Sequence, residues 1–241
     1  MDNQDKKDIS RRDFLKIVGI STAATTAAFV GCDSRKNPVS GDRRAQDEVP
    51  ADRMTYRTNP KSGEKVSLLG YGCMRWPTLQ APGGDGNVID QDAVNELIDY
   101  AIAHGVTYFD TSPVYVQGWS EKSTGIALKR HPRDRFQIAT KLSNFSNYSR
   151  ENSIAMYRQS FEDLQVDYID YYLLHSIGNG GIETFRARYI DNGMLDFLMQ
   201  EREAGRIRNL GFSFHGTVSV FDEVLSMHEK VHFECVQSQL N

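Results

Sequence analysis

The chain has 241 residues, 39% hydrophobic and 25% charged, an ordinary composition for a globular protein with one sizeable core. Its net charge of −4, with no basic stripe interleaved with aromatic residues, argues against nucleic acid as a partner. Three cysteines without a C-x-x-C pair indicate neither a disulfide framework nor a zinc site.

The first 32 residues have the pattern of an export signal. Two lysines precede the sequence SRRDFLK at 10–16, and a weakly apolar run rich in Ala, Thr and Gly follows it to Gly31. This pattern predicts a twin-arginine signal peptide, recognised by the Tat export machinery, with Arg11 and Arg12 as its arginine pair. A run of about fifteen such residues is shorter than the ~20 needed to span a bilayer, so a permanent transmembrane helix is the poorer interpretation. A cytosolic amphipathic helix with a chance arginine pair is a third interpretation.

The apolar run ends in FVGC at 29–32, which resembles a lipobox in which Cys32 is lipidated after cleavage. Phe29 is unusual at its position, and the alternative is an unmodified cysteine near an ordinary cleavage site. We expect an exported protein in the periplasm or on the outer face of the cytoplasmic membrane, with a lipid anchor at Cys32 as its contact with the membrane.

Residues 33–52 hold almost no large apolar side chain, so burial cannot offset the entropy lost on ordering them. They predict a flexible linker. The chain therefore divides into a signal peptide at 1–32, a linker at 33–52 and a folded part at 53–241.

Within 53–241, strand-like and helix-like patterns alternate, as is typical of a parallel sheet with crossover helices. Amphipathic stripes at 94–102, 154–164 and 195–199 predict helices that face the core, the first one capped by Asp90 or Asp92. The strand-like runs are centred near Leu69, Tyr108, Ile138, Tyr172, Gly211 and Val236.

Polar residues stand where several predicted strands end. Asp110 closes one strand and Tyr115 follows it closely, Lys141 ends the run FQIATK, and His175 ends the run DYIDYYLLH. The carboxyl ends of parallel strands meet at one edge of a sheet, so these four groups should share one site. Taken singly, each has an ordinary structural explanation as a packed tyrosine, a surface lysine or a core histidine.

In this order, FDTSPVY, IATK and YLLH resemble the Asp, Tyr, Lys and His tetrad of the aldo-keto reductases. The resemblance runs from about Met54 to Asn241 and includes an opening hairpin, SFEDLQVDYIDYYLLH as the fourth strand and GRIRNLGFSFHG as the fifth. It implies an α/β fold, the (β/α)8 TIM barrel, of which the chain holds about six βα units. Because 53–241 is shorter than the ~250 residues of a complete barrel, we expect an N-terminal fragment with unpaired edges on its first and sixth strands.

The resemblance also implies an activity, the NAD(P)H-dependent reduction of a small aldehyde or ketone. Tyr115 would then be the general acid, since hydride transfer to a carbonyl leaves an alkoxide that needs a proton. A nearby Lys141 ammonium would favour the ionised phenol, Asp110 would keep that lysine charged, and His175 would hydrogen-bond the carbonyl.

Ser213 and Gln237 match the positions at which the family binds the nicotinamide carboxamide, although Phe214 stands where an Asn is usual. The sequence Ser-Phe-His is associated with a bacterial branch whose members carry an iron-sulfur cluster in a C-terminal tail that these 241 residues lack. NADP(H) is favoured over NAD(H), but the family's phosphate contacts lie on strands beyond this sequence, so the choice stays open.

Residues 228–232 match the zinc-protease motif H-E-x-x-H, which requires both histidines on one helical face. The strand-like run from Val231 predicts that His232 lies past the helix end, so a zinc hydrolase is disfavoured.

Two further interpretations of the function stay open. One is a nicotinamide-binding regulatory or sensor subunit, as in the potassium-channel β subunits that resemble this family. The second is an inactive truncated fragment, which is what we expect of the 241 residues alone.

Overall fold

The computed structural model describes residues 51–84 and 86–239. The predicted signal peptide, the lipidation candidate Cys32 and nearly all of the predicted linker lie outside the described residues. The chain divides into two units, Met1–Glu48 and Val49–Asn241, and the second contains every described residue. Within the described ranges, no helix is both long enough and apolar enough to cross a membrane.

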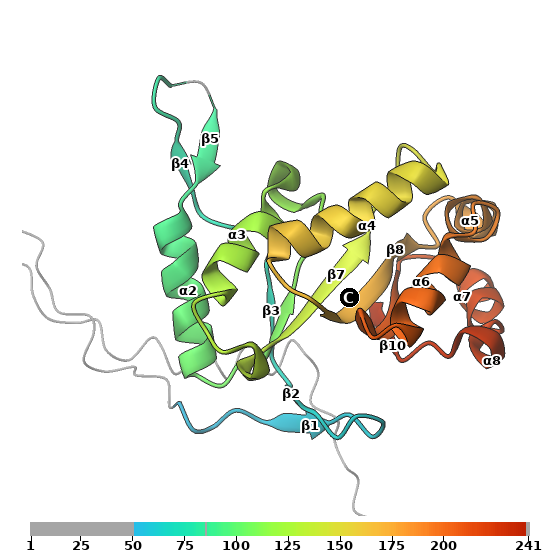
Figure 1. Cartoon of the computed structure of the whole chain (residues 1–241), viewed down its shortest axis with the longest axis horizontal. Coiled ribbons are helices and arrows are strands. Elements are labelled where there is room, and N and C mark those ends of the chain that lie inside the picture. The colour runs from blue at the N-terminus through green and yellow to red at the C-terminus, as the bar shows by residue number, and fades with distance from the viewer. Residues whose placement is uncertain (1–50, 85, 240–241) are drawn as a thin grey trace, which may run out of the picture. The chain divides into compact units, whose positions relative to one another are not determined.

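Six parallel strands form one sheet in the order β10-β9-β8-β7-β6-β3 (Figure 1). Each strand lies beside its neighbour in the chain, as expected of successive βα units. Five of the six predicted strand centres lie inside these strands, and Leu69 directly precedes the sixth. The strands are β3 (Gly70–Gly72), β6 (Tyr108–Asp110), β7 (Gln137–Leu142), β8 (Ile169–Ile177), β9 (Ile207–Phe214) and β10 (Cys235–Ser238).

Helices α2, α3 and α4 lie over one face of this sheet (Figure 1). Asp90 caps α2 by accepting the Ala93 N–H, and Gly105, at φ +86°, follows the helix end. The predicted α2 stripe is buried at four positions, whereas Leu97 is 38% exposed. The helices are α2 (Gln91–Ala103), α3 (Ser120–Leu128), α4 (Arg150–Leu164), α5 (Gly181–Phe185), α6 (Met194–Glu203), α7 (Val218–Leu225) and α8 (His228–Val231). Shorter turns are η1 (Tyr115–Gly118), η2 (Arg133–Arg135) and the π-helical η3 (Arg186–Ile190).

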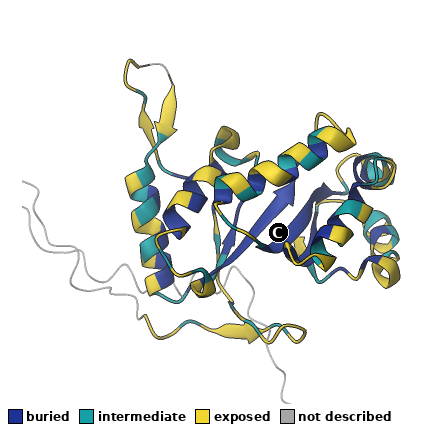
Figure 2. Ribbon diagram, viewed as in Figure 1, coloured by how far each residue is buried: buried dark blue, intermediate teal, exposed yellow. Residues whose placement is uncertain are grey.

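The central strands β7 and β8 are buried at every position, as Figure 2 shows in dark blue. Parallel strands are normally covered on both faces and therefore carry few polar side chains. Buried polar residues on β7 and β8, such as Lys141, Asp170 and His175, consequently need specific partners.

Two antiparallel hairpins stand outside the parallel sheet. The first, β1 (Tyr56–Thr58) with β2 (Lys65–Ser67), agrees with the predicted opening hairpin. The second, β4 (Thr78–Gln80) with β5 (Asn87–Ile89), was not predicted and projects away from the helices (Figure 1).

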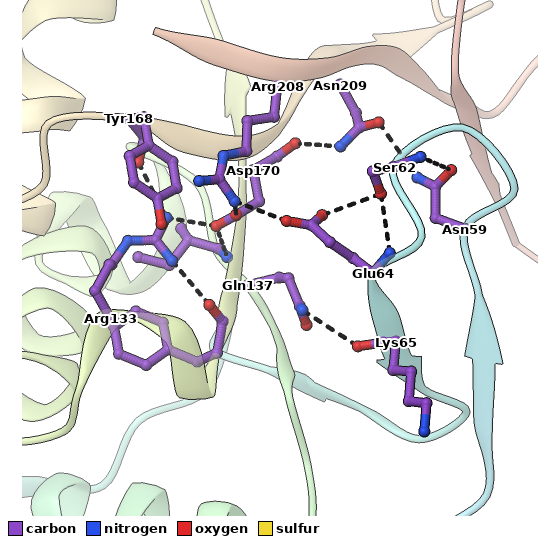
Figure 3. Close-up of polar contacts among 12 residues, drawn as sticks. Asn59, Ser62, Glu64, Lys65, Arg133, Gln137, Tyr168, Asp170, Arg208 and Asn209 are labelled. Carbon is purple, nitrogen blue, oxygen red and sulfur yellow. Dashed lines mark hydrogen bonds and ion pairs between the residues drawn. The ribbon is translucent and has the colours of Figure 1, made fainter. Parts of the chain in front are cut away.

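A chain of polar contacts ties the first hairpin to the amino ends of the sheet strands (Figure 3). Glu64 pairs with Arg208 at 2.7 Å, and Arg208 reaches the carboxylate of Asp170 at 3.4 Å. The other oxygen of Asp170 pairs with Arg133 at 2.5 Å and accepts the Ile138 N–H at 2.9 Å. The hairpin therefore closes the end of the sheet opposite to the predicted site.

Candidate active site

The predicted site residues converge at the carboxyl ends of adjoining strands. Asp110 is the last residue of β6, Lys141 the penultimate residue of β7, and His175 lies near the end of β8. Ser213 and Gln237 are penultimate in β9 and β10 and face each other in the register. Because these strands are neighbours in the sheet, residues far apart in the sequence become adjacent.

Asp110 and Lys141 form a buried ion pair. The Lys141 Nζ atom lies 2.6 Å from Asp110 Oδ1 and donates to the Thr111 carbonyl at 2.8 Å. Lys141 is 1% exposed, and the second oxygen of Asp110 is buried without a hydrogen-bond partner among the described residues. Such a pair has a large desolvation cost, which makes it a stronger pointer to function than to stability.

Tyr115 enters the site from η1, directly after the loop that follows β6. Its backbone N–H donates to the Ser112 carbonyl, and Lys141 Nζ lies 4.9 Å from the centre of its ring. The next two residues, Val116 and Gln117, have φ of 48° and 56°. This left-handed backbone costs about 1–3 kcal/mol at a non-glycine residue, so surrounding contacts must hold the turn.

His175 is the fourth member of the cluster. Its Nδ1 atom lies 2.5 Å from Ser143 Oγ and 3.4 Å from Ser112 Oγ, so Nε2 is the ring nitrogen left for a ligand. The rings of Tyr115 and Phe145 lie 5.9 and 5.0 Å from the imidazole. Burial, followed by the positive charges of neighbouring side chains, lowers the pKa of His175 to about 3. The imidazole is therefore neutral at physiological pH.

The residues matched to cofactor binding suit a carboxamide. Ser213 Oγ accepts the Ser176 N–H at 2.7 Å, which leaves its own proton to donate, and Gln237 is exposed beside it. Phe214 packs on Phe221, with ring centres 5.1 Å apart. It supplies no polar contact where the family usually has an Asn, in agreement with the expectation from the sequence.

A cavity of about 220 Å³ lies at these strand ends, and its lining includes Tyr115, Lys141, His175, Ser213 and Gln237. Larger hollows of about 450 and 770 Å³ lie elsewhere, the former beside Arg133 and Asp170. The smaller cavity is the better candidate because it lies at the carboxyl ends of the strands and its lining includes His175, whose pKa is lowered by burial.

Sequence reasoning gave no role to several residues of the site. Ser112 and His215 lie inside the quoted motifs, and His215 lines the cavity, but neither was assigned. Ser143 and Phe145 follow β7 closely, and only their contacts with His175 reveal them. Arg188 lies in η3, which follows α5 in a segment where no helix was predicted from the sequence.

The zinc-protease motif is not arranged for metal binding. His228 begins the short helix α8, whereas His232 follows its end with φ of 54°. Their ring centres are 6.0 Å apart at 81°, and both residues line the 770 Å³ hollow, not the strand-end cavity. As predicted, His232 lies past the helix end.

Comparison with known proteins agrees with this geometry. The model of the aldo/keto reductase family matches residues 68–241. Probable aldo-keto reductase 1 of Glycine max is 37% identical over 123 residues, covering 48% of this chain and 34% of the relative. L-galactose dehydrogenase of Arabidopsis thaliana is 29% identical over 166 residues, covering 67% of this chain and 49% of the relative. A probable voltage-gated potassium channel subunit beta of the same plant is 30% identical over 130 residues, covering 51% of this chain and 37% of the relative.

Solved structures show the same fold. The holo form of aldo-keto reductase AKR11C1 from Bacillus halodurans superposes with a TM-score of 0.60 at 24% identity, covering 78% of this chain and 58% of that one. The thermostable aldo-keto reductase Tm1743 superposes with a TM-score of 0.60 at 23% identity, covering 78% of this chain and 63% of that one. This chain thus spans about half the length, or less, of the first curated relatives it matches. Its curled sheet of six parallel strands fits part of a (β/α)8 barrel.

Proposed function

Because this chain belongs to the aldo/keto reductase family, we propose that the complete protein reduces a small aldehyde or ketone with NAD(P)H, and that Tyr115 supplies the proton. The observation that carries the proposal is the cluster at the strand ends. The Asp110–Lys141 ion pair lies against the Tyr115 ring, and His175 lies beside that ring.

Tyr115 is the general acid. When hydride reaches the carbonyl carbon, negative charge develops on the oxygen, and the phenol O–H is the proton donor that faces the cavity. The Lys141 ammonium, 4.9 Å from the ring centre, stabilises the phenolate left after proton transfer. Asp110 keeps this lysine charged in its buried position through the 2.6 Å ion pair.

His175 orients the substrate. With Nδ1 occupied by the two serine hydroxyls, its neutral ring donates from Nε2–H to the carbonyl oxygen. An imidazole that remains neutral cannot compete with Tyr115 as the proton donor. The two residues therefore have separate roles, one as a hydrogen-bond donor and one as an acid.

The nicotinamide end of the cofactor would be held by Ser213 and Gln237, whose hydroxyl and amide groups can donate to and accept from a carboxamide. When bound, the reduced cofactor supplies the hydride. We favour NADP(H) over NAD(H). The iron-sulfur cluster inferred for the bacterial branch would require residues beyond Asn241.

The test is Tyr115→Phe in the complete protein. The variant keeps the packing of the ring but lacks the acidic proton, so carbonyl-dependent oxidation of NADPH should fall by ~10²–10⁴-fold. Cofactor binding, followed by nicotinamide fluorescence, should persist. Lys141→Met should slow turnover as well, because the phenolate loses its cation.

His232→Ala is the matched control, since His232 belongs to the zinc-protease motif and lies outside the strand-end cavity. It should leave turnover unchanged. Full activity in Tyr115→Phe, or loss of activity in His232→Ala alone, would reject the assignment of the tetrad.

A regulatory or sensor subunit is the second candidate, favoured by the similarity to the potassium channel subunit beta. It would bind the cofactor without turnover of any carbonyl. Single-turnover oxidation of bound NADPH by a panel of aldehydes and ketones separates the two, because a sensor shows binding and no carbonyl-dependent step.

We also propose that the protein is exported through the twin-arginine pathway and anchored by a lipid on Cys32, in the periplasm or on the outer face of the cytoplasmic membrane. Changing Arg11 and Arg12 together to Lys should keep it in the cytoplasm, as cell fractionation would show. Cys32→Ala should abolish labelling by a fatty-acid analogue without preventing export. Efficient export of the double lysine variant would refute the signal, and unchanged labelling would refute the lipid anchor.

A further inference from the structure

Arg188 is a buried cation beside the proposed site, with 2% of its surface exposed. It lies in η3, the π-helical turn that follows α5. All its hydrogen-bond acceptors are uncharged. They are Asn144 Oδ1 at 3.1 Å, the His175 carbonyl at 2.8 Å, Tyr189 Oη at 2.7 Å and the Leu142 carbonyl at 3.3 Å.

None of the ion pairs found within residues 51–84 and 86–239 includes Arg188. Buried charges are normally paired, because removing an ion from water is costly. The contrast with Lys141 is informative, since Asp110 balances the charge of that lysine. The charge of Arg188 therefore acts on its surroundings with little local compensation.

The contacts of Arg188 join the two central strands. It binds the carbonyl of Leu142, the last residue of β7, and the carbonyl of His175 on β8. Its guanidinium also lies 4.6 Å from the ring centre of Phe145, and that ring packs on His175. One side chain thus fixes the backbone of His175 and supports one side of its imidazole.

The charge of Arg188 also bears on the protonation of His175. The titratable and charged groups that face this imidazole are Lys141 from β7, Tyr115 from η1, His215 after β9 and Arg188 from η3. After burial, the positive neighbours Lys141, Arg188 and His215 each lower the pKa of His175.

We propose that Arg188 is a positioning residue for carbonyl reduction, because it joins the ends of β7 and β8, holds the His175 carbonyl, and is one of the positive charges that favour the neutral, hydrogen-bond-donating ring. This inference rests on the proposed function. The segment between β8 and α6 therefore contributes to the site through Arg188, whose positive charge adds to that of Lys141 near the histidine.

The test measures His175 directly, by long-range ¹H–¹⁵N spectra of the histidine rings during a pH titration of the purified protein. In the parent protein the ring should remain the neutral Nε2–H form to below about pH 5, against ~6.5 for an ordinary histidine. A His175 that becomes protonated near pH 6.5 in the parent would overturn the proposal without any variant.

Arg188→Gln removes the charge but keeps a donor, so the titration midpoint of His175 should rise by about one pH unit or more. Arg188→Lys keeps the charge and should hold the midpoint near that of the parent. Tyr189→Phe is the matched control. It removes the hydroxyl that accepts from the His175 N–H at 3.0 Å and from Arg188 at 2.7 Å, but it leaves every charge in place, so the midpoint should move much less than in Arg188→Gln.

Equal rises in Arg188→Gln and Tyr189→Phe would show that loosened packing alone is responsible, and would overturn the proposal. Should Arg188→Gln not fold, Arg188→Lys still tests the proposal, because a His175 titration midpoint near 6.5 with the charge retained would contradict the role of the charge.

In turnover, Arg188→Gln should lower kcat about tenfold and add an acidic limb to the pH profile. If Tyr115→Phe kept full activity, the proposed function would fail, whereas the titration of His175 would be unaffected.

Discussion

Glu121 is a buried carboxyl group that takes no part in the proposed chemistry. It lies in the first turn of α3, 1% exposed, and accepts hydrogen bonds from Thr140 at 2.5 Å and Ser160 at 3.2 Å. Burial raises its pKa from 4.5 to about 7, more than these hydrogen bonds lower it. The folded protein therefore holds a proton on Glu121 at pH values where the unfolded chain has lost it.

The sign of the pH dependence follows from this proton. Between about pH 4.5 and 7 the folded state binds more protons at Glu121, so the free energy of unfolding falls as pH rises through this window. Glu121→Gln keeps a neutral side chain of the same shape, and should stabilise the protein at pH 8 by up to ~3 kcal/mol while having little effect at pH 4. Urea unfolding at both pH values measures the difference. The exposed Glu203→Gln is the control, and a gain for Glu121→Gln that does not depend on pH would contradict the explanation.

At the residue scale, the structure places three of the candidate site residues at or near strand ends, where the sequence pattern predicted them. Asp110, Lys141 and His175 each end a strand-like run in the sequence, so the order of apolar and polar residues is enough to identify them. Arg188 could not be found this way, because a buried arginine without an acidic partner is recognisable only from its contacts. The proposed roles of the tetrad rest on chemistry that the fold makes possible and that the variants above test.

Among its contacts with the rest of the molecule, the hairpin formed by β1 and β2 is linked through Arg208 to a buried carboxylate. Asp170, 1% exposed, accepts hydrogen bonds from Arg133, Arg208 and the Ile138 N–H (Figure 3). Glu64, on the hairpin, reaches this cluster only through Arg208. Asp170, at the buried end of this network, should therefore contribute more to the free energy of unfolding than Glu64 at the hairpin end.

Asp170→Asn should destabilise the protein by about 3 kcal/mol, because it leaves Arg133 without its partner in a partly buried place. Glu64→Gln removes only a partly exposed ion pair and should cost less than ~1 kcal/mol. In the Asp170 variant, the backbone amides of β2 should also exchange faster with solvent. Equal effects of the two substitutions on urea unfolding would show that the hairpin is not held through Asp170.

At the element scale, the sequence pattern located the strands of the sheet most clearly at β7 and β8, which are long and buried at every position. It missed the hairpin β4–β5, whose Leu79 and Val88 are half exposed and therefore leave no buried pattern. It also predicted no helix within 176–192. The five-residue helix α5 and the π-helical η3 are too short for a clear helical period.

The sheet as a whole has two edges. Within the described residues, β3 pairs only with β6 and β10 only with β9, so the parallel strands curl without meeting. The resemblance to the aldo-keto reductases implied a barrel, and the length of 53–241 predicted that it does not close. An open edge of a parallel sheet offers unpaired backbone groups to any other strand.

The 241-residue chain on its own should therefore self-associate and unfold over a broad range of urea. Val236 on the edge strand β10 is 40% exposed, and Val236→Lys should reduce association by placing a charge on that edge. Val218→Lys is the matched control, because Val218 is 74% exposed on helix α7 and not on an edge strand. Sedimentation velocity over a concentration series measures association, with the lysine on β10 lowering it and the lysine on α7 having little effect. A soluble monomer with one sharp urea transition would contradict this prediction and show that six strands fold on their own. Partial unfolding that starts at open edges broadens the transition, whereas a unit that unfolds cooperatively gives a sharp one.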